Sequence, residues 1–187
     1  MDSIIGQDFK VNLKCDEKLD LCEGIAFVKS PKCGAIQCFI GTIRDSDVSS
    51  SESSGDQVQL EPIKAIRYEA YEMMALKQMA EIVQRTLDVE PPNGCSLDHN
   101  ARAMVSARLG LVPVGEEAIM ICVSSTSRKF SYEATMSILN EIKRTVTIWK
   151  KIVFSDGREE WDALHKSEAA WKFINDDDGE ICDSLLP

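Results

Sequence analysis

The stretch from residue 124 to residue 151 constrains the fold most, because a strand end, a whole helix and the start of the next element follow one another within it. Its sequence is SSTSRKFSYEATMSILNEIKRTVTIWKK. On a helix, Lys143 falls within about one residue's angular width of Tyr132, Met136 and Leu139. The sequence therefore predicts a helix that carries a lysine on an apolar stripe, in its last turn.

The pattern leaves two interpretations of Lys143 open. If the stripe is buried, desolvation disfavours the charged ammonium, and the lysine then suits proton transfer or nucleophilic attack near neutral pH. Alternatively, the lysine stem lies along the core while its charge stays in water and complements the C-terminus of the helix. Periodicity alone favours the second interpretation.

The composition is that of a globular chain with an acidic surface. Of the 187 residues, 44% are hydrophobic and 28% are charged, and the net charge is −10. No run of about eighteen uninterrupted apolar residues is present, and the N-terminus lacks a basic region followed by an apolar core, so we expect a cytoplasmic protein without a membrane span. The acidic balance argues against general nucleic-acid binding.

Positive charge is nevertheless concentrated in one region of this acidic chain. The cluster could focus a small anion into a cleft, or it could be a solvated basic face, and the charge pattern does not separate the two. Its members are Arg128, Lys129, Lys143, Arg144, Lys150 and Lys151.

The cysteines and histidines do not predict a metal site. The seven cysteines are odd in number and irregularly spaced, so we expect reduced thiols. No C-x-x-C motif occurs, and the two histidines, His99 and His165, lie far from any cysteine pair. We therefore expect neither a metal nor a bound cofactor.

In the N-terminal half, apolar spacing predicts two helices and two strands. Residues 16–29 have the pattern of a short helix, and the apolar run 33–42 that of a buried central strand. The polar, serine-rich segment 45–62 predicts a mobile loop. Residues 64–71 alternate as a half-solvated strand, and the helix that follows them has a buried stripe of Leu76, Met79, Val83 and Leu87.

In the C-terminal half, alternation over 103–109 and an apolar run over 119–125 predict a hairpin with a long connection. Trp161, Leu164, Glu168 and Trp171 have helical spacing, and 176–187 is an acidic tail. This order of elements predicts an α+β fold in which helices cover one face of a mixed or antiparallel sheet, and no second domain is visible.

The chain contains several motifs in the same order as the family of large, catalytic subunits of molybdopterin synthase, and it resembles that family over most of its length. They are Phe39-Ile40-Gly41-Thr42-Ile43-Arg44, Tyr68-Glu69-Ala70-Tyr71, Arg108-Leu109-Gly110 with Pro113-Val114-Gly115-Glu116, Ser124-Ser125 with Arg128, Glu133-Ala134, and Lys143 with Ile148-Trp149-Lys150-Lys151. The resemblance implies a single α/β hammerhead-like domain over residues 1–187, with a small additional β subdomain.

The resemblance also implies an activity and an assembly. In that family, a small ubiquitin-like carrier subunit presents a C-terminal thiocarboxylate to a pocket that binds cyclic pyranopterin monophosphate. Sulfur is transferred twice to form the molybdopterin dithiolene of the molybdenum cofactor. The family's assembly is a heterotetramer, in which two catalytic subunits form a homodimer and each binds one carrier.

The resemblance assigns roles to individual residues. Lys143 and Lys150 match the catalytic lysines of the family's pocket. The expected substrate-binding residues are Phe39, Arg44, Ser127, Arg128 and Lys151. Cations of this kind suit the reaction, because they hold phosphate and offset the charge that develops in the transition state.

Two departures from the family pattern keep a second hypothesis open. Ser127 and Ala107 stand where the family usually has histidine, and serine replaces a switchable acid and base by a neutral hydrogen-bond partner. The rival is a non-catalytic relative that binds the carrier subunit as a scaffold. A small-anion or nucleotide-binding domain is a third alternative, although no phosphate-loop glycine pattern supports it.

Overall fold

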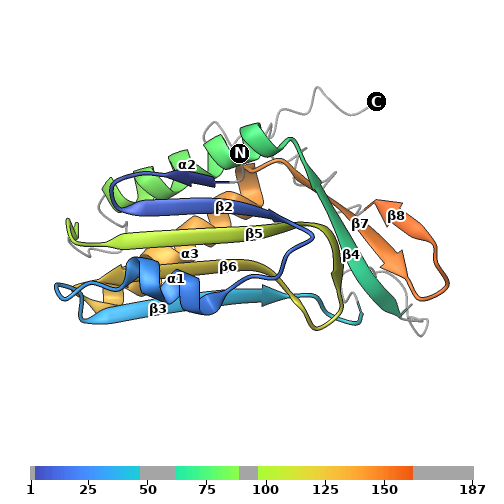
Figure 1. Cartoon of the computed structure of the whole chain (residues 1–187), viewed down its shortest axis with the longest axis horizontal. Coiled ribbons are helices and arrows are strands. Elements are labelled where there is room, and N and C mark those ends of the chain that lie inside the picture. Colours follow the sequence, from blue (N-terminus) through green and yellow to red (C-terminus); the bar gives the residue numbers. More distant parts are fainter. Residues whose placement is uncertain (1–2, 47–61, 89–96, 162–187) are drawn as a thin grey trace, which may run out of the picture.

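The computed structural model describes residues 3–46, 62–88 and 97–161, which form eight strands and three helices (Figure 1). In chain order the elements are β1 (Ser3–Ile5), β2 (Phe9–Cys15), α1 (Leu21–Val28), β3 (Ala35–Thr42), β4 (Ile63–Ala70), α2 (Glu72–Asp88), β5 (Arg102–Pro113), β6 (Glu117–Ser125), α3 (Arg128–Thr145), β7 (Ile148–Phe154) and β8 (Glu159–Trp161).

Strand β5 joins the two parts of the mixed sheet. Its first half lies between β2, which runs parallel to it, and β6, which runs antiparallel. Its second half pairs with β4, and β4, β7 and β8 continue the sheet as antiparallel neighbours. In Figure 1 these last strands diverge from the long strands, which confirms the small additional β subdomain.

A glycine allows β5 to change partners. Gly110 has φ +84°, and a Cβ atom at this position would lie 2.1 Å from the Oδ1 atom of Asp16. Asp16 itself has φ +56° and donates its backbone N–H to the carbonyl of Leu109, at 3.2 Å. Only glycine satisfies both the backbone conformation and the close approach of the carboxylate.

Helices lie on both faces of the sheet, so the prediction that they cover only one face is wrong. The apolar stripes of α2 and α3 pack on one face, and the main core there includes the predicted stripe of Leu76, Met79, Val83 and Leu87, all of them buried. Helix α1 covers part of the other face, where Val28 packs with methionine and cysteine side chains of β5 and β6. The α+β class is confirmed, and α1 is the one helix of the three on the face opposite α2 and α3 (Figure 1).

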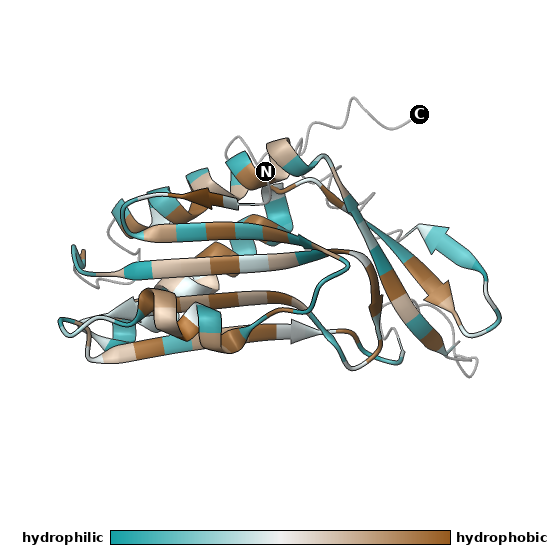
Figure 2. Cartoon of the chain, viewed as in Figure 1, coloured by the Kyte–Doolittle hydropathy of each residue, from teal (hydrophilic) through white to brown (hydrophobic). Residues whose placement is uncertain are grey.

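The hydropathy of the strands follows their position in the sheet (Figure 2). In β5, every residue from Ala103 to Leu109 is buried, because helices cover both of its faces there. Strand β8 is exposed along its length and is largely hydrophilic. Strand β2 is intermediate, because polar and apolar residues alternate along it.

Two sequence predictions about the strands are wrong. The run 33–42 was expected to be a buried central strand, but β3 pairs only with β6 among the described strands, and none of its residues is buried. Helix α3 and the β6 neighbour cover it only in part, which leaves Ile36 and Ile40 exposed. The prediction of a long hairpin connection is also wrong. Strand β5 continues through Gly110, and only residues 114–116 separate it from β6.

The prediction of a C-terminal helix is wrong at Trp161, its first residue. Trp161 ends strand β8, where it pairs with Lys151 of β7. Leu164, Glu168 and Trp171 lie outside the described residues, as do the tail 176–187 and most of the predicted loop 45–62. The single-domain prediction for residues 1–187 stays a prediction. None of the described helices is long and apolar enough to cross a membrane.

Candidate active site

A cavity of about 500 Å³ opens where the two parts of the sheet diverge, beside the C-terminal end of α3. Strands from both parts contribute to its walls. Its lining comprises Phe39, Gly41, Thr42, Ile43, Arg44, Ser46, Ile63, Ile66, Tyr68, Ala107, Arg108, Ala118, Ile119, Ile142, Lys143, Val146, Ile148, Lys150 and Ile152. Four of the seven residues predicted for the site, Phe39, Arg44, Lys143 and Lys150, are therefore brought together.

Strand alternation places Lys150 in the cavity and its neighbour outside it. Ile148, Lys150 and Ile152 line the cavity, as expected for one face of a strand. Lys151 points to the opposite face of β7. Its Nζ lies 3.6 Å from Oε1 of Glu69 and 4.2 Å from the centre of the Trp161 ring.

Helix α3 carries Lys143 to the cavity. Its buried stripe is formed by Phe130, Ser131, Ala134, Thr135, Ile138 and Ile142. Of the stripe that Lys143 shares, Tyr132 is 56% and Met136 53% accessible, whereas Leu139 is partly buried against the core. The condition for the first interpretation of Lys143 is therefore not met within a single chain, since Lys143 is itself exposed.

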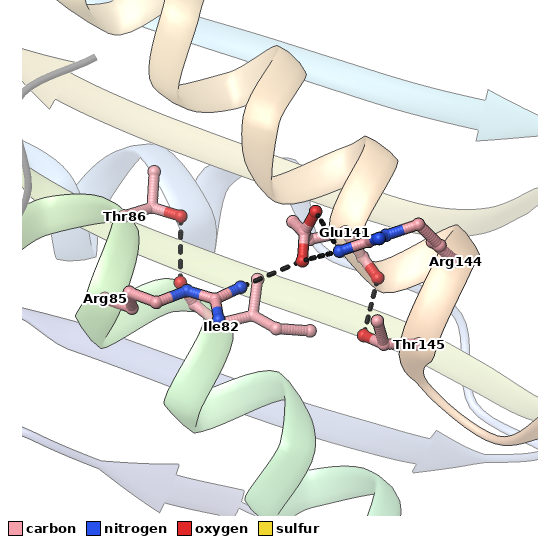
Figure 3. A network of polar contacts seen from close by, with 6 residues as sticks. All are labelled: Ile82, Arg85, Thr86, Glu141, Arg144 and Thr145. Atoms are coloured by element: carbon pink, nitrogen blue, oxygen red, sulfur yellow. Dashed lines mark hydrogen bonds and ion pairs between the residues drawn. The ribbon is translucent and has the colours of Figure 1, made fainter. Parts of the chain in front are cut away.

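Ion pairs hold the last turns of α3 against α2 (Figure 3). Oε2 of Glu141 accepts a hydrogen bond from Nη2 of Arg85 on α2, at 2.8 Å, and both carboxylate oxygens accept from Arg144. The hydroxyl of Thr145 donates to the Glu141 carbonyl at 2.7 Å. This network fixes the backbone that precedes and follows Lys143.

The end of β3 carries Phe39 and Arg44 into the lining. The β3–β6 register shifts between Gly41 and Thr42, so the chain leaves regular pairing there. Beyond it, Ile43 donates its N–H to the carbonyl of Glu116 at 3.0 Å and accepts from the N–H of Gly115 at 2.8 Å. These two hydrogen bonds anchor the residue that precedes Arg44.

Arg108 is a further cation of the cavity lining, and its side chain is only 5% accessible. Its Nη1 donates to Oε2 of Glu116 at 2.7 Å, while its Nε is buried and has no hydrogen-bond partner in the described part of the chain. Lys18 and then Arg108, both hydrogen-bonded to this carboxylate, lower the pKa of Glu116. Glu116 thus stays ionised and offsets part of the Arg108 charge.

The lining combines cations with an apolar surface. Arg44, Arg108, Lys143 and Lys150 supply positive charge, and no aspartate or glutamate is among the lining residues. Most of the remaining lining is aliphatic or aromatic. Such a cavity suits an anion that also has an apolar or planar part, because the cations can bind its charged group while the apolar lining covers the rest. No cluster of three or more potential metal-ligating His, Cys, Asp or Glu side chains occurs among the described residues.

Two predicted site residues lie at the far end of α3. Ser127 is its N-cap and accepts a hydrogen bond from the Lys129 N–H at 3.3 Å, and Arg128 is the exposed first residue of the helix. Lys143 lies fifteen positions after Arg128 along the helix, which corresponds to about 22 Å. One small molecule in this cavity therefore does not contact both side chains of one chain.

Sequence reasoning missed Arg108 and Tyr68 as lining residues. Arg108 had a signal, because it is the one charged residue within the apolar run 103–109, and a charge in a fully buried strand requires a partner. Tyr68 shares the inner face of β4 with Ile66. Its place in the site depends on the divergence of β4 from β6, which the sequence pattern does not reveal.

The fold and the cavity define a small α+β protein with a cation-lined binding site at the end of a helix. The chain belongs to the MoaE protein family, whose family model matches residues 15–145. Catalytic subunit 1 of molybdopterin synthase from Aedes aegypti is 36% identical over 157 residues, which cover 83% of this chain and 88% of the relative. The corresponding subunit from Taeniopygia guttata is 35% identical over 165 residues and covers 88% and 92% of the two chains.

Solved structures agree with this assignment. Molybdopterin synthase from Staphylococcus aureus superposes with a TM-score of 0.64 at 25% identity, and covers 80% of this chain and 94% of that one. A complex of subunits 1 and 2 of the molybdopterin-converting factor from Helicobacter pylori shares the fold, with a TM-score of 0.55 at 17% identity and coverage of 80% and 88%. The family and the enzyme class expected from the sequence, a catalytic subunit of molybdopterin synthase, are confirmed.

Proposed function

We propose that this chain catalyses sulfur transfer from a thiocarboxylated small carrier subunit to cyclic pyranopterin monophosphate, which forms the molybdopterin dithiolene. One observation supports the proposal most: four cations line a cavity without carboxylates, two of them the lysines that match the family's catalytic pair. Both the pterin phosphate and the thiocarboxylate are anions, and a site that holds them together requires this charge. In this proposal the reaction takes place in the cytosol.

The residues divide into two roles in the proposed reaction. Lys143, an exposed residue of the cavity lining, moves a proton or bonds transiently to the terminal carbonyl of the carrier. Arg44 and Lys150 hold the phosphate or the carrier's carboxyl group, and Phe39 supplies an apolar surface for the pterin ring. Lys151 faces away from the cavity, so it takes part only by stabilising β7 against β8.

The proposed partner is a small ubiquitin-like carrier whose C-terminal tail enters the cavity. The Helicobacter pylori protein of the same fold was solved as a complex of subunits 1 and 2. An extended tail suits this site, because the cations of the cavity lining attract a terminal thiocarboxylate.

A homodimer would give Ser127 and Arg128 a place in the reaction. These residues cannot reach the cavity of their own chain, but a second copy related by a twofold axis can bring its α3 N-terminus to the cavity. The surface between the two ends of α3 suits such contact: Tyr132 and Met136 are exposed, and α3 packs on β3, whose outer edge has no partner strand among the described residues. Exposed apolar surface beside an open strand edge is typical of an interface.

The rival scaffold function has one observation in its favour. Ala107 is a small apolar lining residue of the cavity, where the family usually offers histidine, so this wall supplies no acid or base. The scaffold would bind the carrier and release no product.

Reconstitution separates the two functions. The full chain is combined with a thiocarboxylated carrier subunit and cyclic pyranopterin monophosphate, molybdopterin is measured as its fluorescent oxidation product, and carrier binding is measured in parallel by calorimetry. Product formation supports the enzyme, and the expected yield is several turnovers per chain. Carrier binding without product would support the scaffold, and the absence of both would refute the proposed function.

A further inference from the structure

Two cysteines face each other across neighbouring strands on the side of the sheet that α1 covers. Cys38 of β3 is directly opposite Cys122 of β6 in the antiparallel register. Opposed residues of an antiparallel pair have Cα atoms about 4.5 to 5.5 Å apart, which lies within the range that a disulfide spans. Both side chains belong to the same apolar cluster, in which Cys122 is buried and Cys38 packs against it.

The two thiols differ in their exposure. Cys122 is fully buried, in a cluster with Val28, Met104 and Met120, whereas Cys38 is partly exposed at the rim of this cluster. Burial, and then the neighbouring Cys38 thiol, raise the pKa of Cys122 to about 12. An oxidant therefore reaches Cys38 first, and Cys122 is held in position to react with it.

The strand that carries Cys38 can accommodate a new covalent bond. Strand β3 pairs only with β6 among the described strands, so a small shift of β3 disturbs no second strand. Bringing the Cβ atoms to disulfide distance requires a movement of roughly 1 Å or less. A central strand, paired on both sides, would resist such a shift.

We propose that Cys38 and Cys122 form a reversible cross-strand disulfide, a redox modification site of this chain. With hydrogen peroxide as the oxidant, the Cys38 thiolate attacks one peroxide oxygen, which gives a sulfenic acid and hydroxide. The sulfur of Cys122 then attacks the sulfur of Cys38, loses its proton and displaces the sulfenic hydroxyl as water, while the hydroxide takes up the proton that the Cys38 thiol had lost. In total, two thiols and one peroxide yield one disulfide and two waters.

The disulfide would connect the redox state of the chain to one wall of the cavity. Cys38 is adjacent to Phe39, which points to the other face of β3 and lines the cavity. Oxidation cross-links β3 to β6 beside this residue, so we expect the backbone amides of residues 35–42 to exchange with solvent more slowly in the oxidised chain. The modification itself does not depend on the proposed catalytic function.

Peptide mapping tests the proposal directly. The folded full chain is treated with hydrogen peroxide or oxidised glutathione, free thiols are alkylated, and the protein is digested with trypsin without reduction. Cleavage after lysine and arginine places Cys38 in peptide 33–44 and Cys122 in peptide 109–128. We expect these two peptides to be recovered as one linked species that is two hydrogens lighter than their sum and separates on treatment with dithiothreitol.

Two variants make the result specific. Peptide 33–44 also contains Cys33, whose Sγ contacts the carbonyl of Asn100, so Cys33→Ser must leave the linked species unchanged. Cys38→Ser must abolish it, and this part-exposed position tolerates serine better than the buried Cys122 does. The proposal is wrong if Cys122 is recovered fully alkylated while the exposed Cys15 and Cys22 are oxidised, or if the linked species persists in Cys38→Ser.

Discussion

Arg108 and Glu116 form an ion pair beside the cavity, with 2.7 Å between Nη1 of the buried arginine and Oε2 of the glutamate. The same glutamate accepts the backbone N–H of Ile43 through its carbonyl, at 3.0 Å. The pair therefore connects the middle of β5, the β5–β6 turn and the segment that carries Arg44. Besides lining the cavity, Arg108 therefore positions this turn, while its Nε is enclosed by protein.

Neutralising Glu116 should destabilise the chain and weaken the site together. In Glu116→Gln the buried guanidinium of Arg108 loses its counter-charge, so we expect the free energy of unfolding to fall by more than it does in Glu117→Gln. Urea denaturation measures this loss. Glu117→Gln is the matched control, because no ion pair is described for its side chain. An equal loss in both variants would contradict the role of the ion pair.

Stability should decrease in acid partly because of Asp98. Burial raises the pKa of this carboxylate, but hydrogen bonds from Thr126 and Asn100 outweigh burial, and the pKa lies below its ordinary value of 3.8. The carboxylate therefore contributes stability that is fully present above the unfolded-state pKa and is lost as the pH falls through the folded-state pKa. Asp98→Asn should reduce the unfolding free energy by about 2 kcal/mol at pH 7 and flatten its dependence on pH below about 4.

Urea midpoints from pH 7 to pH 3 test this prediction. Thr126 donates both its N–H and its hydroxyl to Asp98, at 2.6 and 3.0 Å, just before α3 begins. Parallel pH profiles of the wild type and Asp98→Asn would show that other carboxylates cause the acid sensitivity.

Substitutions at two glycines allow the stability cost of backbone strain to be distinguished from that of a steric clash. Gly110 and Gly115 have similar positive φ angles, +84° and +82°, but a Cβ atom meets Asp16 at the first position and nothing within 4 Å at the second. Gly115→Ala should cost about 1 to 2 kcal/mol through backbone strain alone. Gly110→Ala should cost at least about 2 kcal/mol more, because Asp16 or the β5 bend must move. Equal melting temperatures would contradict the close packing of Asp16 on Gly110.

Adjacent lysines of β7 should behave differently in turnover. Lys150 lines the cavity, so Lys150→Ala should lower the rate of molybdopterin formation by about 10- to 100-fold. Lys151 contacts Glu69 and Trp161 on the opposite face, so Lys151→Ala should leave the rate within about twofold and cost under about 1 kcal/mol of stability. Initial rates with the thiocarboxylated carrier measure both effects. A larger loss of rate in Lys151→Ala than in Lys150→Ala would reverse this assignment of the two faces.

Local sequence patterns predicted the elements that have one buried face. The stripe on α2 and the position of Lys143 in the last turn of α3 follow from helical periodicity alone. The apolar run of β3 was misread, because an apolar edge strand has the same composition as a buried one, and only the pairing of β6 with both β3 and β5 shows which of them is central.

The candidate site was predicted less completely, because it depends on how distant segments converge. Motif order identified Phe39, Arg44, Lys143 and Lys150, and the structure brings them to one cavity. Strand alternation alone could have separated Lys150 from Lys151, whereas the distance of Arg128 from the cavity follows from helix length. The role of Arg108 required the β5–β6 register, since its partner Glu116 lies beyond the turn.

The rate of molybdopterin formation by Lys143→Ala tests the central claim most directly. The matched control is Lys77→Ala, which removes an exposed lysine of α2 that is not part of the cavity lining. Both variants are compared with the wild type at equal concentrations of chain, thiocarboxylated carrier and pterin substrate. We predict a loss of at least about 100-fold for Lys143→Ala, with carrier binding retained, and a rate within about twofold of wild type for Lys77→Ala. A wild-type rate in Lys143→Ala would contradict the assignment of this lysine and of the cavity as the site of sulfur transfer.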